Sequence, residues 1–239
     1  HVSTTIPVGA GLSSSAALEI AVALALDCEL PATELAQMTQ RAEHLATGVP
    51  TGIMDQLCIT SARQGHGALI DCTTLEIRHI PIPSDVKIVV RFIAHRTLVG
   101  SAYADRVAQC ATAESIIGPL RNAATSDIAK IDNKIIRARA SHVVSENERV
   151  LDFSSALEEG DYHTAGFVMT DSHTSLSNDF AVSNSQMDQA VRDMCATPGV
   201  FGARMTGGGF GGCIVALCEP DAVVDGWHVQ PVGAAHHVA

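Results

Sequence analysis

The chain contains 239 residues, 46% of them hydrophobic, and carries a formal net charge of −11. A chain of this size and composition buries a sizeable core, as one large domain or two closely packed small ones, so an intrinsically disordered protein is excluded. The negative charge argues against nucleic acid as a partner, because binding a phosphate backbone requires a concentrated basic surface. A nucleotide ligand is still compatible with it, since backbone amides or one metal ion can hold a triphosphate.

Neither a membrane nor an oxidising compartment is indicated. Residues 16–26 form the most apolar early stretch, but this stretch is too short to cross a bilayer and contains Glu19. Residues 1–7 are typical of a strand and its approach to a loop, not of a signal peptide. The seven cysteines include no Cys-x-x-Cys pair, which argues against a disulfide framework and a zinc site. We therefore expect a cytoplasmic protein with no membrane partner.

The first part of the chain predicts an opening strand, three helices and three further strands. A short β-branched run predicts the opening strand at residues 2–6. Ser13 is expected to cap the first helix, and glycines follow the ends of the next two. The expected helices are 13–26, 32–45 and 52–63, and the strands after them are 68–71, 75–80 and 86–92.

The rest of the chain predicts four helices and then three strands. The helices are expected at 101–117, 132–157, 162–176 and 185–195, and the strands at 199–206, 213–218 and 227–231. Because helices and strands come in runs and not in strict alternation, the pattern favours an α+β fold over a doubly wound parallel sheet. A division near Ser84 predicts an N-terminal lobe of residues 1–84 and a C-terminal lobe of residues 85–239. The sequence leaves the oligomeric state open, and we take a monomer as the expectation.

The strongest local signal is the glycine–serine loop at residues 7–16, Pro-Val-Gly-Ala-Gly-Leu-Ser-Ser-Ser-Ala. Glycine lets the backbone approach a phosphate closely, and the helix that follows points free N–H groups and its positive dipole end at that phosphate. No Lys-Ser or Lys-Thr pair follows, so the loop differs from the lysine-containing P-loop. The alternative is a glycine turn before a capped helix with surface serines. The candidate phosphate-binding residues are Gly9, Ala10, Gly11, Leu12, Ser13, Ser14 and Ser15.

Two carboxylates, Glu43 and Asp55, stand on either side of a Gly-Val-Pro-Thr-Gly turn at residues 48–52. This turn is able to fold both side chains toward one cleft. Phosphoryl transfer needs Mg²⁺ across the phosphates and an oriented acceptor hydroxyl, and one carboxylate suits each of these needs. The alternative is that Glu43 is a solvated helix residue and that Asp55 merely suits an early helix position electrostatically.

A second glycine run, Gly-Gly-Gly-Phe-Gly-Gly, occupies residues 207–212 between two predicted strands. Glycines this dense cost backbone entropy on folding, so a packing or ligand reason for them is expected. The run would let the backbone approach a substrate or the transferred phosphate. The alternative is a tight turn with bulges.

These segments together resemble the family of galactose, homoserine, mevalonate and phosphomevalonate kinases. The glycine–serine loop is similar to that family's second motif, and residues 206–212 are similar to its third. Stretches at 52–56, 65–76 and 100–103 resemble the galactokinase branch in particular, and segments within 139–147 and 172–176 fit that branch as well. The match runs in the expected order from about Ser3 to Leu217.

The resemblance implies a two-lobed kinase fold in which the γ-phosphate of ATP passes directly to the C1 hydroxyl of galactose, with Mg²⁺ as the cofactor. Asp55 would lie beside that hydroxyl as base or orienting carboxylate. Glu43 and Ser15 would hold Mg²⁺. The substrate-binding residues implied in addition to Asp55 are Gly52 and Tyr103 along the sugar, and Gly208 and Gly209 close to sugar and phosphate.

The sequence departs from the family pattern in two places. The family's first motif, which supplies carboxylates for the sugar hydroxyls, has no counterpart, and the segment between Glu219 and Trp227 is shorter than usual. Three alternatives therefore stay open: a kinase of N-acetylgalactosamine or arabinose, a regulator that binds ATP and galactose without turnover, and an inactive truncated copy. The complete Ser-Ser-Ser-Ala-Ala run at residues 13–17 favours an enzyme lineage over the regulator.

Overall fold

The structure is a computed structural model that describes residues 1–7, 9–95 and 102–237. Val8 of the glycine–serine loop, and Gly100 and Ser101 of the galactokinase-like stretch at 100–103, lie outside the described residues. Ser101 was also the expected first residue of a helix. The elements in chain order are α1 (Ser14–Ala25), α2 (Ala32–Thr47), α3 (Met54–Ser61), β1 (His66–Ile70), β2 (Ile77–Pro81), β3 (Lys87–Ala94), α4 (Tyr103–Ile117), η1 (Leu120–Asn122), α5 (Thr125–Ile128), α6 (Lys134–Glu159), α7 (Tyr162–Asn178), α8 (Ser185–Cys195), β4 (Val200–Met205), β5 (Gly212–Cys218) and β6 (Trp227–Val229).

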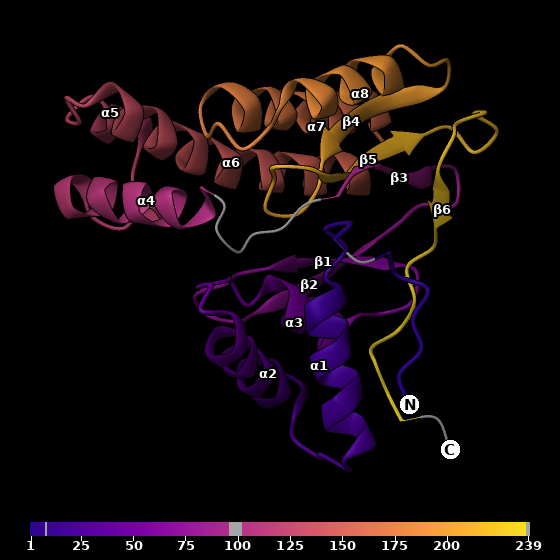
Figure 1. The fold of residues 1–239 in the computed structure, drawn as a ribbon. Helices are drawn as coiled ribbons and strands as arrows, with labels where there is room; N and C mark the ends of the chain where they lie inside the picture. The colour runs from indigo at the N-terminus through magenta and orange to yellow at the C-terminus, as the bar shows by residue number, and fades with distance from the viewer. Residues whose placement is uncertain (8, 96–101, 238–239) are drawn as a thin grey trace.

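The strands form two antiparallel sheets. β1 pairs with β2, and a four-stranded sheet has the order β4-β5-β3-β6. In Figure 1, helices α1, α2 and α3 lie with the small sheet, while α4 to α8 lie with the large one. The molecule is therefore α+β, as the runs of predicted elements indicated. The predicted division at residue 84 stays a prediction.

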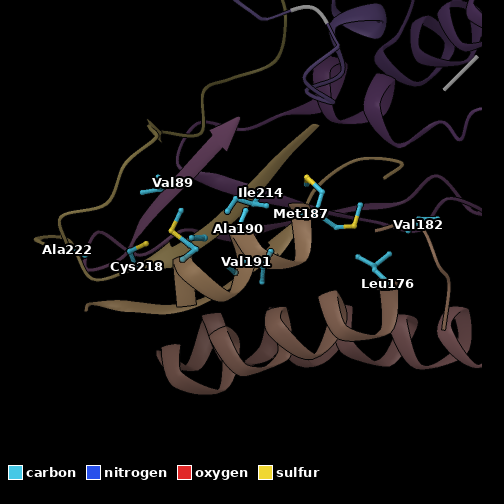
Figure 2. Packing of buried hydrophobic residues seen from close by; sticks show 13 residues of the cluster. Val89, Leu176, Val182, Met187, Ala190, Val191, Ile214, Cys218 and Ala222 are labelled. Carbon is cyan, nitrogen blue, oxygen red and sulfur yellow. The ribbon is translucent and has the colours of Figure 1, made fainter. Parts of the chain in front are cut away.

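The largest part of the core lies where α8 and the end of α7 pack on the large sheet. Figure 2 shows this cluster, which contains Met187 from α8 together with Val89 and Ile214 of the sheet. Successive residues of a strand point to opposite faces. In β5, Ile214 belongs to this cluster, while Leu217 belongs to a second one with residues of α6 and α7. Both faces of β5 are therefore buried.

Helix α7 and strand β4 touch through their backbones. A Cβ atom added at Gly166 would lie 2.2 Å from the carbonyl oxygen of Phe201, and one added at Gly202 would lie 1.9 Å from the carbonyl oxygen of Gly166. Because real Cβ atoms never approach a backbone atom so closely, only glycine fits at both positions.

The predicted strand at residues 2–6 is wrong. Within residues 1–7 the structure has no strand, and the amide of Ile6 donates locally to the hydroxyl of Thr4 at 3.0 Å. A strand needs a neighbouring strand to receive its backbone hydrogen bonds, and β-branched composition alone does not supply one. The short elements η1 and α5 were not expected either.

The end of the chain returns to the N-terminal elements. After β6, the amide of Gly65 donates to the carbonyl of Pro231 at 3.1 Å, and the amide of Ala235 donates to the carbonyl of Ile59 at 2.9 Å. Figure 1 shows this segment descending beside α1. Residues 231–235 therefore tie the sheet of β3 to the region around α3 and β1.

Apart from the face that carries Ser15 and Glu19, helix α1 is apolar. One side is buried through Ala16, Ile20 and Ala23. Another side leaves Leu18 at 46%, Val22 at 44% and Leu26 at 77% exposure. Among the described residues, no helix combines the length and the hydropathy that a membrane span requires.

Candidate active site

The glycine–serine loop turns through three left-handed residues before α1 begins. Gly9, Gly11 and Ser13 have φ values of 73°, 72° and 55°. Ser13 occupies the N-cap position of α1, but its side chain makes no capping bond, contrary to the sequence-based expectation. The left-handed backbone of Ser13 accounts for this, because a capping side chain requires an extended backbone. The Ser13 side chain therefore accepts no hydrogen bond from the first amides of α1, which point out of the helix start. The Ala17 amide donates to the Ser13 carbonyl at 3.0 Å.

The loop is seated on the large sheet. Ala10 is 1% exposed and packs with Val90 of β3 and Cys213 of β5. Leu12 packs against the same cluster. Because Cys213 directly follows the second glycine run, this contact places the two glycine segments next to each other.

Glu43 is the centre of a polar cluster that joins the three N-terminal helices. The Ser15 hydroxyl donates to Glu43 Oε1 at 2.6 Å, and the Thr51 hydroxyl donates to Oε2 at 3.0 Å. The Gln56 amide also donates to Oε2, at 2.9 Å. Glu43 is only 8% exposed, so it is not a solvated helix residue. Ser15 and Glu43, the two proposed metal ligands, are in direct contact.

A second carboxyl, Glu19, lies beside Glu43. Burial, and then the negative charge of Glu43, raise the pKa of Glu19 to about 7. Among the described residues, Glu19 Oε2 and Gln56 Oε1 are buried oxygens without a hydrogen-bond partner, and Gln56 itself is 0% exposed. Buried oxygens without hydrogen-bond partners next to a carboxylate favour the binding of a cation between them. Glu19 was not predicted to have a role in the site, although it follows Ser15 by one helical turn on the same face of α1.

A cavity of about 680 Å³ collects most of the predicted substrate-contacting residues. Asp55, from the first turn of α3, lines this cavity together with Gly52, Tyr103 and Gly208. The wall is completed by apolar residues of β1, β2, α6 and α7, among them Leu69, Ile80, Phe153 and Met169. The catalytic candidate thus faces a hollow that the second glycine run borders.

Gly209 and the phosphate-binding candidates are not on the wall of this cavity. A Cβ atom added at Gly209 would lie 2.5 Å from the carbonyl oxygen of Val182, so Gly209 packs against the segment after α7. The loop residues from Gly9 to Ser15 reach the cavity indirectly. Ser15 contacts Glu43, and Glu43 contacts Thr51, which lines the cavity next to Gly52.

Three charged residues on the cavity wall were not identified from the sequence. Glu146 accepts from Arg149 at 2.8 Å and from Arg204 at 2.9 Å, and the Ser172 hydroxyl donates to it at 2.5 Å. Burial opposes ionisation of Glu146, but the charge of Arg204 and the bonds from Ser172 and Arg149 hold its pKa below the usual value. The spacing of Glu146 and Arg149 on one helix face was a usable signal. Arg204 lies 58 positions further along the chain, and no local pattern connects it to them.

Metal ligation by protein side chains alone is not indicated. In the described ranges, no group of three or more histidine, cysteine, aspartate or glutamate side chains is arranged to hold an ion. A cation at Ser15 and Glu43 would therefore take further oxygen ligands from a substrate or from water, as Mg²⁺ usually does when it is bound with a nucleotide.

Two family models match the chain, in order. The model described as "GHMP kinases N terminal domain" matches residues 1–63, and the model described as "GHMP kinases C terminal" matches residues 153–228. The chain belongs to the GHMP kinase family. The N-terminal match contains the glycine–serine loop, Glu43 and Asp55, and the C-terminal match contains the second glycine run. Tyr103 and Glu146 lie between the two matched parts.

Galactokinases are among the curated relatives of this GHMP kinase. The chain is 42% identical to the galactokinase of Chloroflexus aurantiacus over 252 aligned positions, which cover 96% of this chain and 64% of the relative. It is 40% identical to human galactokinase, with coverage of 92% and 59%. The chain thus spans roughly three fifths of the length of these relatives.

Solved structures agree with this assignment. The galactokinase of Lactococcus lactis, solved in complex with galactose, superposes with a TM-score of 0.86 at 33% identity, covering 90% of this chain and 60% of that one. A mevalonate kinase from L. major superposes with a TM-score of 0.58 at 19% identity, covering 93% of this chain and 67% of that one, and shares the fold. The α+β arrangement is therefore the GHMP kinase fold.

Proposed function

We propose that this GHMP kinase transfers the γ-phosphate of ATP to the C1 hydroxyl of galactose, giving galactose 1-phosphate and ADP. The observation that carries the proposal is that Asp55 faces the same cavity as Gly208, while the start of α1 is joined to that cavity through Glu43. The galactokinase relatives and the galactose complex of the Lactococcus lactis enzyme support galactose as the acceptor.

In this proposal the glycine–serine loop binds the β- and γ-phosphates of ATP. The backbone is left-handed at Gly9, Gly11 and Ser13. A glycine-rich loop of this kind can turn amides between Gly9 and Ser14 toward a bound phosphate. The first-turn amides of α1 add the positive end of the helix dipole. These groups neutralise the polyphosphate tail without a lysine.

Asp55 accepts a hydrogen bond from the acceptor hydroxyl and directs its oxygen at the γ-phosphorus. Because phosphoryl transfer needs positioning more than covalent chemistry, an oriented hydroxyl and a held phosphate provide most of the catalysis. Gly52 and Tyr103 line the sugar on one side, and Gly208 lets the backbone approach it on the other. The phosphoryl group moves in one displacement.

Mg²⁺ fits beside Ser15 and Glu43. The carboxylate of Glu43, the hydroxyl of Ser15 and the buried oxygens of Glu19 and Gln56 together make an oxygen-rich, negatively charged environment. When bound, the ion would neutralise charge that develops on the phosphates. Ser15 and Glu43 would be its protein ligands.

We place the protein in the cytoplasm, because all seven cysteines are free thiols.

A coupled assay of ADP release with galactose tests the proposal. The unmutated chain is expected to release ADP with galactose, and Asp55→Asn to lower kcat by roughly 10²- to 10⁴-fold, the usual contribution of a positioned acid–base group. The exposed Asp132 offers a matched control, since Asp132→Asn should leave the rate unchanged. Absence of galactose-dependent ADP release from the unmutated chain, or full activity of Asp55→Asn, would overturn the assignment.

A further inference from the structure

The segment at residues 179–182, between α7 and α8, supports the second glycine run. The amide of Phe210 donates to the carbonyl of Val182 at 2.7 Å. Gly209 lies against the same carbonyl so closely that no side chain fits. Val182 is itself 3% exposed and packs in the main core cluster (Figure 2). The position of residues 209–210 therefore depends on the position of the backbone at Val182.

Both sides of this contact contain a residue in an unfavourable backbone conformation. Ala181 has φ 53° and Phe210 has φ 63°, in the left-handed region where side chains crowd the backbone. Such conformations persist where the surroundings enforce them, and they gather at sites of function. Something must therefore hold the segment at residues 179–182 in place.

Two arginines hold three successive carbonyl groups of this segment. Arg106 from α4 donates to the carbonyl of Phe180 at 2.7 Å and to that of Ala181 at 3.0 Å. Arg139 from α6 donates to the carbonyl of Asp179. Both guanidinium groups also donate to Gln109 Oε1, at 3.1 Å from Arg106 and 2.9 Å from Arg139. We call Arg106, Arg139 and Gln109 the arginine clamp.

The arginine clamp brings two positive charges together in a largely buried place. Arg139 is 8% exposed, and burial together with the charge of Arg106 lowers its pKa. In the part of the chain that the structure describes, neither arginine forms an ion pair with a carboxylate. Two like charges close together are unfavourable. The hydrogen bonds of Arg106 and Arg139 therefore indicate what the pair is for, which is to hold backbone carbonyl groups.

Arg106 also lies on the helix that brings Tyr103 to the cavity. The two residues are three positions apart at the start of α4, so they are neighbours on one helix face. Tyr103 and Gly208 both line the cavity. We propose that Arg106 is a positioning residue. It fixes the place of the second glycine run relative to Tyr103, and it acts through the backbone of residues 180–182. The kinetic part of this inference rests on the proposed galactose phosphorylation, whereas its structural part does not.

Amide hydrogen exchange tests the structural part directly. Arg106→Met keeps the apolar stem and removes the donors. In this variant the Phe210 amide is expected to exchange at least about tenfold faster, because the carbonyls of Phe180 and Ala181, directly before its acceptor Val182, are no longer held. The amide of Ala216 in β5 should keep its rate. Arg137→Met is the matched control, since Arg137 donates to the carbonyl of Ile131 outside the clamp. In Arg106→Lys one ammonium reaches a single carbonyl, so the Phe210 amide should exchange at a rate between those of the unmutated chain and Arg106→Met. This variant tests the inference if Arg106→Met does not fold.

An unchanged Phe210 exchange rate in Arg106→Met would overturn the inference. Acceleration of Ala216 by the same factor would also overturn it, because the effect would then be global loss of stability. In kinetics, Arg106→Met is expected to lower kcat at least about tenfold and to change the KM for ATP by less than about threefold, since the phosphates are held mainly by the glycine–serine loop. If the unmutated chain shows no kinase activity, the proposed function fails, and the exchange experiment still decides the role of Arg106.

Discussion

At the scale of single residues, Glu43 shows how a buried carboxylate organises a site. Its two oxygens accept from Ser15, Thr51 and Gln56, which belong to three different segments of the chain. Each hydrogen bond to a charged group contributes about 1.5–3 kcal/mol. The same carboxylate thus stabilises the packing of the N-terminal helices and offers a negative charge at the start of α1.

Glu43→Gln separates these two roles. The neutral amide keeps the shape of the side chain and loses the charge, so we expect the Mg²⁺ concentration for half-maximal activity to rise about tenfold or more while the far-UV circular dichroism stays the same. Calorimetric titration with Mg²⁺ and an ATP analogue measures the same change without turnover. The exposed Glu29 provides the control, Glu29→Gln. An unchanged Mg²⁺ dependence would remove Glu43 from the metal site.

His142 is expected to make stability depend on pH. Burial lowers the pKa of His142 to about 4, and the ring contacts Ser175 at 3.0 Å and Phe180 at 4.6 Å between centroids. The His142 side chain has a pKa near 6.5 in the unfolded chain and about 4 in the folded chain. Its contribution to the free energy of unfolding is therefore fully present above pH 6.5 and is lost as the pH falls toward 4.

In His142→Gln this loss between pH 6.5 and 4 should become smaller, as measured by urea unfolding at several pH values. The buried His173, whose pKa burial also lowers, keeps its own contribution in both proteins. A variant with the same pH dependence as the unmutated chain would show that His142 is not the group responsible.

At the scale of elements, the backbone contact of α7 with β4 leaves no room for change. Gly166→Ala places a methyl group 2.2 Å from backbone atoms of Phe201, which cannot move aside without shifting the strand. We expect a loss of about 3 kcal/mol in the free energy of unfolding, the upper part of the range for overpacking. Gly233→Ala, at an exposed glycine with open space around it, should change stability by less than about 0.5 kcal/mol. Equal stability of the two variants would contradict the contact.

The sequence predicted most elements because their signals are local. The helix at residues 185–195 was expected with its observed bounds, and Asn184 caps it by accepting from the amide of Met187. The strand at residues 2–6 was wrong because pairing is not a local property. The turn at residues 48–52 indicated that Glu43 would approach the catalytic region, and the structure places its carboxylate against Thr51 of that turn.

Other parts of the site depend on contacts that no local pattern encodes. Glu146 meets Arg204 across 58 positions of the chain, and Arg106 meets Phe180 across 74. Sequence spacing predicts neighbours within a helix or across a tight turn, whereas these pairs form only once α6, α7 and the sheet have packed. The arginine clamp was for this reason invisible before the fold was known.

At the scale of the whole molecule, the C-terminal segment joins parts that are far apart in sequence. A chain that ends at Gln230 loses the two backbone hydrogen bonds that Pro231 and Ala235 accept and donate. Each of these hydrogen bonds contributes about 1 kcal/mol, so the truncation should lower the free energy of unfolding by about 2 kcal/mol. The fluorescence of Trp227, the single tryptophan, reports the transition. A truncated chain as stable as the full one would show that these bonds contribute nothing.

The exposed apolar side of α1 affects how copies of the chain behave toward one another. Leu18, Val22 and Leu26 present hydrocarbon to water, while the net charge of −11 keeps molecules apart. Added salt screens this repulsion and strengthens the attraction between apolar surfaces. Light scattering of the purified chain should therefore rise with sulfate concentration, and Leu18→Glu should delay that rise. Three side chains on one helix and its C-cap thus contribute to the colloidal behaviour of the chain in concentrated electrolyte.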